Sequence, residues 1–215
     1  MKRKINFLLT QTKVDTIYIT VDDHTLSPYR EKTNNLDRSI YFSTINDYSN
    51  VFLFLKEKTV FNIAFLQPKK RTILKKYISS FFKMNDNGNS KTITNTPWAK
   101  MSKKEQFNSS KNRFDSQFPT IDRSKLLEQT LLEIILLCKK NNIALIGLKF
   151  PLSQEYIEIM ENQTYGASKI FNENGLKVLD FKSKLILEDK LFSNQDHLND
   201  EGGIQFKNIL FKKSL

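Results

Sequence analysis

The second half of the chain alternates helical and strand patterns with short joins, and this alternation constrains the fold more than any other feature. After Ser124, a capping residue type, apolar side chains recur at helical spacing through Cys138. A continuous apolar run at 143–148 is typical of a strand buried on both faces. The pattern continues with a helix at 156–160, a strand at 176–180 and a final helix around 204–210. It predicts βαβ units and a mostly parallel sheet.

The first half adds one strand and a less regular middle. A helix is expected at 5–12, and a β-branched run at 16–21 predicts a strand that ends in Asp22-Asp23-His24. Further segments are expected as helices at 51–61, 64–66 and 73–82, and as a loop at 84–96. Residues 98–118 fit a lid, a helix with a ragged apolar face or a partner-binding insert. We therefore predict one α/β domain over 1–215, with a flexible or lid-like insert at 84–118.

The chain is basic, with Lys+Arg 34, Asp+Glu 23 and a formal net charge of +11. The densest cluster, Lys69-Lys70-Arg71 with Lys75-Lys76, fits either a solvated helical face or an anion-binding patch. No reading helix, glycine-rich clamp or aromatic RNA platform is recognisable, so nucleic acid is not the partner we predict.

Cysteine and histidine counts exclude several classes of site. Cys138 is the single cysteine, which excludes an internal disulfide framework and a cysteine-based zinc site. It lies on an apolar helical stripe, as an inert buried thiol would. His24 and His197 are the two histidines, so no three-histidine site can form. We expect neither a metal nor a cofactor. No apolar run is long enough to span a bilayer, and the one after Lys4 is too short for a signal peptide.

The string from Asn194 to Gly203 is the sharpest candidate for chemistry. His197 lies in a polar stretch just before the last helix, with the carboxylate of Asp196 beside it. Such a carboxylate can fix the tautomer of an imidazole and stabilise its protonated form, which suits general-base catalysis. Asn199 is a natural helix cap, and Gly202-Gly203 permit close approach of another backbone segment.

This string, together with the segments at 138–151 and 178–181, resembles the C-terminal block of the SGNH (GDSL-like) hydrolase superfamily. In that family an Asp-x-x-His motif before the closing helix supplies the base and its orienting acid. The resemblance covers Lys125 to the C-terminus and, more thinly, 14–30. It implies a three-layer α/β/α sandwich with a mostly parallel sheet, with catalytic roles for His197, Asp196 and Asn194.

The motif Asp-His-Leu-Asn, followed by Gly, is most similar to the corresponding motif of the branch that acylates cell-surface polysaccharide and teichoic acid. This resemblance implies an esterase or O-acyltransferase acting on an acylated or acyl-accepting envelope glycan. It also implies a membrane-bound acyltransferase as partner and a location in the cell envelope, outside the cytoplasmic membrane.

The chain departs from the family pattern at two places. Asn194 occupies the acid position of the Asp-x-x-His frame, and no Gly-Asp-Ser block follows an N-terminal strand. Aligning the end of the first strand with that block would put Asp23 at the serine. In the interpretation we prefer, the chain begins after the nucleophile block, so the sheet would lack its first strand.

A second candidate pair is Asp22 with His24, which resembles the Asp-x-His acid–base pair of alginate-acetylation relatives. Its serine would be Ser27, Ser153 or Ser168, and the structural alternative is a loop-capping role for His24. Two further functions stay open, namely a non-catalytic SGNH-fold binding or scaffold protein in polysaccharide assembly and, ranked below it, a basic nucleic-acid-binding protein. Trp98, with phenylalanines at 107, 114 and 118, fits a carbohydrate-stacking platform or a packed core.

Overall fold

The computed structural model describes residues 1–32, 39–63, 96–182 and 184–214, which fall into two compact units. The first, here the N-terminal unit, comprises Met1–Val14 and Asn35–Thr94. The second, the sheet unit, comprises Asp15–Asn34 and Asn95–Leu215. Each is described by itself, and the expectation of a single domain stays a prediction.

The described part of the N-terminal unit is helical. Its elements are α1 (Lys2–Gln11), η1 (Ile40–Phe42), η2 (Ile45–Asp47) and α4 (Val51–Asn62). Phe7 of α1 meets the rings of Tyr41 and Phe42 edge-on, and Asn50 caps α4 by accepting a hydrogen bond from the Leu53 N–H. The helices expected at 5–12 and 51–61 are confirmed. Those at 64–66 and 73–82, the basic cluster at 69–76 and residues 84–95 of the expected loop lie outside the described residues.

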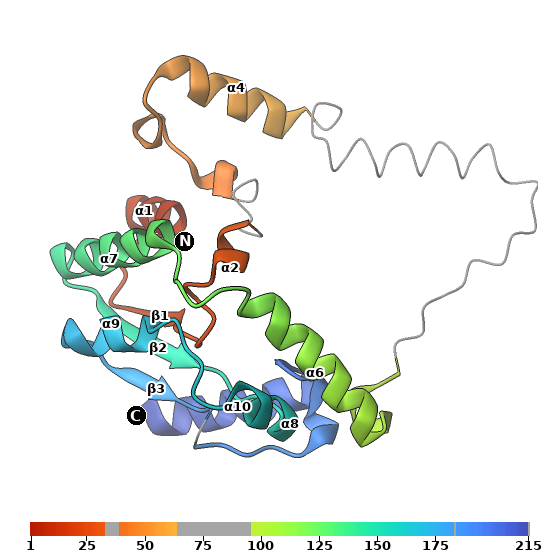
Figure 1. The fold of residues 1–215 in the computed structure, drawn as a ribbon. Coiled ribbons are helices and arrows are strands. Elements are labelled where there is room, and N and C mark those ends of the chain that lie inside the picture. Colours follow the sequence, from red (N-terminus) through yellow and green to blue (C-terminus); the bar gives the residue numbers. More distant parts are fainter. Residues whose placement is uncertain (33–38, 64–95, 183, 215) are drawn as a thin grey trace, which may run out of the picture. The chain divides into compact units, whose positions relative to one another are not determined.

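The sheet unit is built on three parallel strands (Figure 1). They are β1 (Thr16–Thr20), β2 (Ala144–Lys149) and β3 (Val178–Asp180), in the spatial order β1-β2-β3. Ile17 of β1 lies opposite Leu145, and Leu148 lies opposite Leu179 of β3. The predicted α/β class with a parallel sheet is confirmed at this level.

Helices alternate with these strands largely as the sequence predicts. In chain order the described helices of this unit are α2 (Pro28–Lys32), η4 (Trp98–Lys100), α6 (Lys103–Gln117), α7 (Lys125–Lys140), α8 (Gln154–Met160), α9 (Ala167–Glu173), η5 (Asp189–Leu191) and α10 (Asp200–Ser214). Ser124 caps α7 by accepting from the Leu127 N–H, as expected. Helix α6 forms within residues 98–118, the segment that fits a lid, a helix with a ragged apolar face or a partner-binding insert. Helix α9, two turns long, was not predicted.

One expectation for the fold is wrong. The polar stretch at 193–200 is not all loop, because β4 (Phe192–Asn194) and β5 (His197–Leu198) form an antiparallel hairpin. Strands of three and two residues are too short to produce an alternating apolar pattern, so sequence periodicity could not detect them. His197 therefore lies on a strand and is paired with Asn194 of the other strand of the hairpin.

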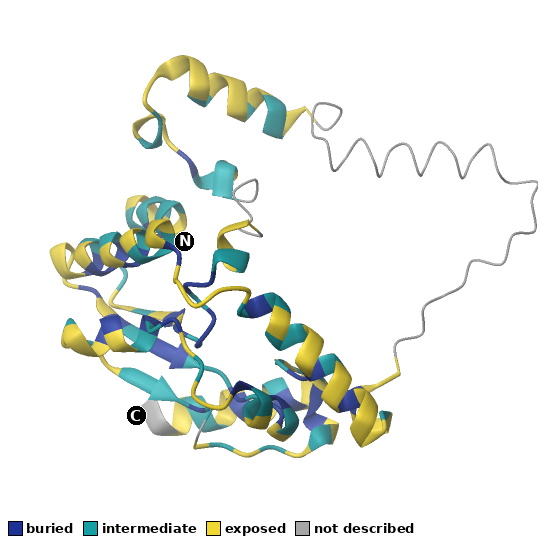
Figure 2. Cartoon of the chain, viewed as in Figure 1, coloured by how far each residue is buried: buried dark blue, intermediate teal, exposed yellow. Residues whose placement is uncertain are grey.

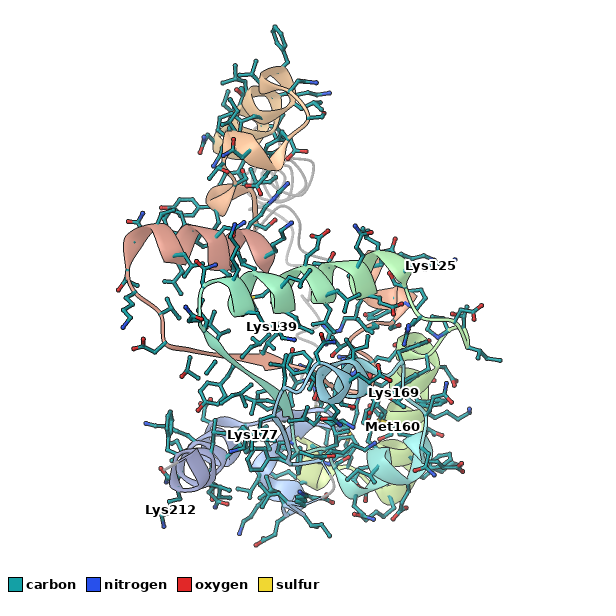
Figure 3. The ribbon with its side chains drawn as sticks, turned by 90° about the vertical axis from the view of Figure 1, so that its left-hand side faces the viewer. Lys125, Lys139, Met160, Lys169, Lys177 and Lys212 are labelled. Atoms are coloured by element: carbon teal, nitrogen blue, oxygen red, sulfur yellow. The ribbon has the colours of Figure 1, made fainter. Side chains whose placement is uncertain are left out.

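Aromatic side chains join the helices to the sheet. Phe206 of α10 packs with Leu148 and Phe181, and its ring meets that of Phe181 edge-on with centroids 5.0 Å apart. Phe171 of α9 lies against Gly147 of β2, where a Cβ would approach its ring to within 3.1 Å. Helix α7 contacts β2 as well. Figure 3 shows α7, from Lys125 towards Lys139, lying on one side of the strands.

Leu191, the residue just before the hairpin, is held close to the start of α10 by backbone contacts. Asn199 accepts from the Gly202 N–H at 2.9 Å, while its own N–H donates to the Leu191 carbonyl at 2.9 Å. A Cβ on Gly202 would lie 2.2 Å from that carbonyl oxygen, whereas one on Gly203 would meet nothing within 4 Å. The predicted capping by Asn199 and close approach at Gly202 are confirmed, whereas the close approach predicted at Gly203 is wrong because no other described segment lies near it.

Two neighbouring glycines provide a matched test of this contact. Gly202→Ala should lower the free energy of unfolding by about 1–3 kcal/mol, because the Leu191 carbonyl must move. Gly203→Ala should raise it by about 0.5–1 kcal/mol, because alanine is the better helix former and has open space. Urea unfolding followed by circular dichroism measures both. Equal effects of the two substitutions would contradict the packing described here.

Candidate functional site

Charged side chains gather where the three parallel strands end. Asp22 and Asp23 follow β1, Lys149 closes β2 and Lys182 follows β3. The Val21 N–H donates to the Leu148 carbonyl and the Phe181 N–H to the Lys149 carbonyl, which continues the pairing to this edge. In open α/β sheets, sites form outside the carboxyl ends of the strands.

Asp23 is a buried anion held between two lysines. Its Oδ1 lies 2.6 Å from Lys149 Nζ and its Oδ2 lies 2.6 Å from Lys182 Nζ. Burial opposes ionisation, but the two ammonium groups outweigh it and hold the pKa of Asp23 below its ordinary value. Asp23 thus joins the ends of all three strands. Because both its oxygens are engaged, it is not available as a nucleophile at the position where the alignment places serine.

The pKa of Asp22 is shifted in the opposite direction to that of Asp23. Its Oδ1 accepts a hydrogen bond from the Phe150 N–H at 2.9 Å. Burial raises the pKa of Asp22 to about 6, and the neighbouring charge of Asp23 adds to the rise. This carboxyl group therefore changes protonation state close to neutral pH.

His24 is a neutral, buried imidazole. Its Nε2 lies 2.6 Å from a guanidinium nitrogen of Arg30, which can only donate, so Nε2 is the acceptor and Nδ1 carries the proton. Burial, reinforced by the positive charge of Arg30, lowers the pKa of His24 to about 3. Since the basic nitrogen is occupied, this geometry favours the structural alternative for His24 over the acid–base role expected with Asp22.

His197, unlike the buried His24, has 60% of its side-chain surface open to solvent. Its Nδ1 lies 2.9 Å from Asn194 Oδ1 and 3.0 Å from Asp196 Oδ1. Only the Asn194 contact has the direction of a hydrogen bond, so the approach to Asp196 is electrostatic. The structure therefore brings all three expected residues together, with Nδ1–H directed at oxygen acceptors. Nε2 is left as the basic nitrogen of the ring.

Asp196 is itself fixed from the opposite side by helix α6. Its Oδ2 accepts from Arg113 Nε at 2.8 Å and from Gln117 Nε2 at 3.0 Å, and a second Arg113 nitrogen lies at 2.8 Å. The side chain is only 5% exposed. Although burial opposes it, contact with His197 and Arg113 lowers the pKa of Asp196 to about 2. Asp196 thus stays ionised beside the imidazole.

Gln117 extends this network into the core. Its Oε1 accepts a hydrogen bond from the buried Tyr156 hydroxyl at 2.5 Å, and its backbone carbonyl accepts one from Ser27 Oγ at 2.5 Å. Burial raises the pKa of Tyr156 well above its usual range. Sequence reasoning missed Arg113, Gln117 and Tyr156, since nothing in their local context distinguishes them from other polar residues on helices.

The two candidate groups predicted from the sequence lie in one electrostatic neighbourhood. Ser27, three residues after His24, donates to the Gln117 carbonyl, and the Gln117 side chain donates to Asp196. After burial, the charges of Arg30, Asp196, Arg113 and Asp23 therefore act together on the pKa of His24. The hairpin, α6 and the loop after β1 therefore contribute charged groups to a shared region beside the strand ends.

Two of the three candidate serines have other roles in the described structure. Ser27 donates to the Gln117 carbonyl, Ser153 caps α8 by accepting from the Tyr156 N–H, and Ser168 is half-buried in α9. Among the described residues, no serine hydroxyl is hydrogen-bonded to an imidazole nitrogen. The buried thiol of Cys138, whose pKa is raised by burial, matches the expectation of an inert group.

Trp98 belongs to the core. Trp98 is fully buried, whereas Phe107 is exposed. These two residues therefore do not form the carbohydrate-stacking platform that was one interpretation of the sequence. The rings of Phe114, Phe118 and Tyr165 form a separate stack in which neighbouring centroids are 5.0 and 5.3 Å apart.

Within the described ranges, no group of three or more His, Cys, Asp and Glu side chains is arranged to hold a metal ion. None of the described helices has the length and apolar composition needed to cross a bilayer. Comparisons with protein-family models, curated proteins and solved structures gave no match.

The two buried groups after β1 predict opposite effects of pH on stability. Between pH 6.5 and about 3 the unfolded chain binds a proton at His24 that the folded protein excludes, so stability falls on acidification. Between about pH 6 and 3.8 the folded protein binds a proton at Asp22 before the unfolded chain does, so stability rises on acidification.

Substitutions at these residues should change the slope in opposite directions. His24→Gln, whose amide can still accept from Arg30, should lessen the acid-induced loss of unfolding free energy by up to about 1.4 kcal/mol per pH unit. Asp22→Asn should steepen it by a similar amount. Urea unfolding at several values between about pH 6 and pH 4 provides the test. Parallel profiles for all three proteins would contradict these assignments.

Proposed function

We propose that this chain is an SGNH-like esterase or O-acyltransferase-type protein that acts on an acyl ester of an envelope glycan, with His197 as its general base. The observation that carries the proposal is the arrangement of His197. Its Nδ1 is directed at Asn194 and lies beside the ionised Asp196, while the ring is exposed. An imidazole held in one tautomer beside an anion is suited to accept a proton and to be stabilised once charged.

The proposed step uses the hydroxyl group of the acceptor. Water in hydrolysis, or a glycan hydroxyl in transfer, attacks the acyl carbon, and His197 Nε2 takes the hydroxyl proton as the new C–O bond forms. The bond to the leaving alkoxide then breaks, and the imidazolium returns the proton to it. Asp196, kept ionised by Arg113, stabilises the positive charge on the ring between these events. This series of steps needs no serine nucleophile, which agrees with the hydrogen bonds that Ser27 and Ser153 make elsewhere.

The sheet unit is compatible with this kind of scaffold. Three parallel strands end at one edge, beside the charged groups, and α7 and α10 lie on opposite sides of the strands in Figures 1 and 3. This supports the proposal of a three-layer sandwich. The glycan substrate, the membrane-bound acyltransferase partner and the envelope location are proposed from the sequence resemblance alone.

A second candidate function is a non-catalytic SGNH-fold protein that binds glycan or scaffolds its assembly. The observation that favours it is Asp23, which is held in two ion pairs and which the alternative alignment would put at the serine position. In this alternative His197 is an exposed binding residue, and no acyl group is transferred.

Hydrolysis of p-nitrophenyl acetate separates the two functions. We expect the chain to hydrolyse this ester faster than buffer alone, and His197→Ala to lower the protein-dependent rate about a hundredfold, because the proton acceptor is lost. His24→Gln is the matched histidine control and should keep the wild-type rate, because its Nε2 is already bonded to Arg30.

Circular dichroism should confirm that both variants are folded. If wild type and His197→Ala are equally inert, the catalytic proposal fails and the binding alternative takes its place. If His24→Gln abolishes the activity and His197→Ala does not, the base has been assigned to the wrong histidine.

A further inference from the structure

Helix α4 of the N-terminal unit makes few contacts with the rest of the unit, and its least exposed residues, Phe54, Lys58, Val60 and Phe61, are only half-buried. Glu57 accepts from the Tyr48 hydroxyl at 2.7 Å, Lys58 donates to the Tyr41 carbonyl at 3.1 Å, and Phe54 meets the Tyr48 ring. Positions 54, 57 and 58 share one face of the helix. A surface helix of a globular domain ordinarily keeps its large apolar residues against the core, whereas several of those on α4 face solvent.

The outward side carries large apolar residues. Phe52 is 79% exposed, and no residue of α4 is buried (Figure 2). Phe52 lies on the side of the helix opposite positions 54, 57 and 58, and Leu55, three residues after Phe52, lies between that side and position 58. We call the exposed apolar set on and beside α4 the α4 patch: Val51, Phe52, Leu53, Leu55 and Ile63.

This exposure is concentrated in one unit. Among the described residues, nine of the eighteen exposed large apolar side chains belong to the N-terminal unit, which supplies 39 of the 175 described residues. Single exposed apolar residues are normal on protein surfaces, but a cluster of this kind marks a surface that binds a partner.

The charge of the same unit indicates the chemistry of that partner. Its described residues include six Lys and Arg but only two Asp and Glu. On α4 itself Lys56 is exposed, between Leu55 and the exposed Glu57. Apolar side chains flanked by basic ones are the pattern by which helices bind the interface of anionic membranes.

We propose that the α4 patch docks onto an anionic lipid surface, with Phe52 and Leu55 inserted at the level of the acyl-chain boundary and Lys56 facing the head groups. The positive charge of the unit favours this surface over an uncharged bilayer. Basic residues within a Debye length of the lipid add attraction that salt screens. The docking site contains none of the proposed catalytic residues and does not depend on the proposed activity.

Co-sedimentation with vesicles tests this directly. The full chain should bind vesicles of phosphatidylglycerol and phosphatidylcholine, and should bind phosphatidylcholine vesicles at least about tenfold more weakly. Phe52→Ser/Leu55→Ser should reduce binding to the anionic vesicles at least about tenfold, because the inserted apolar surface is lost. Ile121→Ser is the matched control, since Ile121 is 90% exposed in the sheet unit and should leave binding unchanged.

Two results would overturn the proposal. One is failure of the folded wild-type chain to bind anionic vesicles, or equal binding by wild type and the double variant. The other is a concentration-dependent dimer, seen by light scattering, that Phe52→Ser/Leu55→Ser abolishes while vesicle binding is unaffected. That result would assign the α4 patch to a second copy of this chain. Ester hydrolysis by the double variant is measured in parallel and should equal that of wild type.

Discussion

The buried carboxylate of Asp196 is the interaction on which the arrangement beside the strand ends depends. An ionised group with so little exposure is stable only where charged and polar partners replace water, and here Arg113 and Gln117 do so from helix α6. Because Asp196 belongs to the turn of the β4–β5 hairpin, the same contacts hold the hairpin and therefore His197. The geometry of the imidazole is thus determined by a helix some eighty residues earlier in the chain.

Two buried anions organise this region differently. Asp23 is paired with lysines from the ends of the neighbouring strands, so its charge is compensated within the sheet. Asp196 leaves one oxygen near His197 without a hydrogen bond. A buried oxygen of that kind lowers the energy of an imidazolium beside it. This difference is why the proposed chemistry is assigned to the hairpin rather than to the loop after β1.

Sequence reasoning recovered the parts of the fold that local pattern determines. Long or strongly apolar segments of sequence predicted the strands β1, β2 and β3 and the helices α7 and α10. The cap by Asn199 could also be predicted, because it joins residues only three positions apart. The hairpin was missed because its strands are too short to show a period. The partners of Asp196 were missed because Arg113 and Gln117 are ordinary helical residues whose role arises only from tertiary contact. The alignment that would put Asp23 at the nucleophile position, which we did not prefer, likewise gave no indication that two lysines neutralise this residue.

The most direct test of the account is the protonation pattern of the His197 ring, observed by long-range proton–nitrogen NMR of the folded chain near neutral pH. The account predicts a proton on Nδ1 and an unprotonated Nε2 in the neutral ring, a preference that weakens in Arg113→Gln, where Asp196 loses its anchor. A ring protonated mainly on Nε2, as is usual for free histidine, and unchanged by Arg113→Gln, would contradict it.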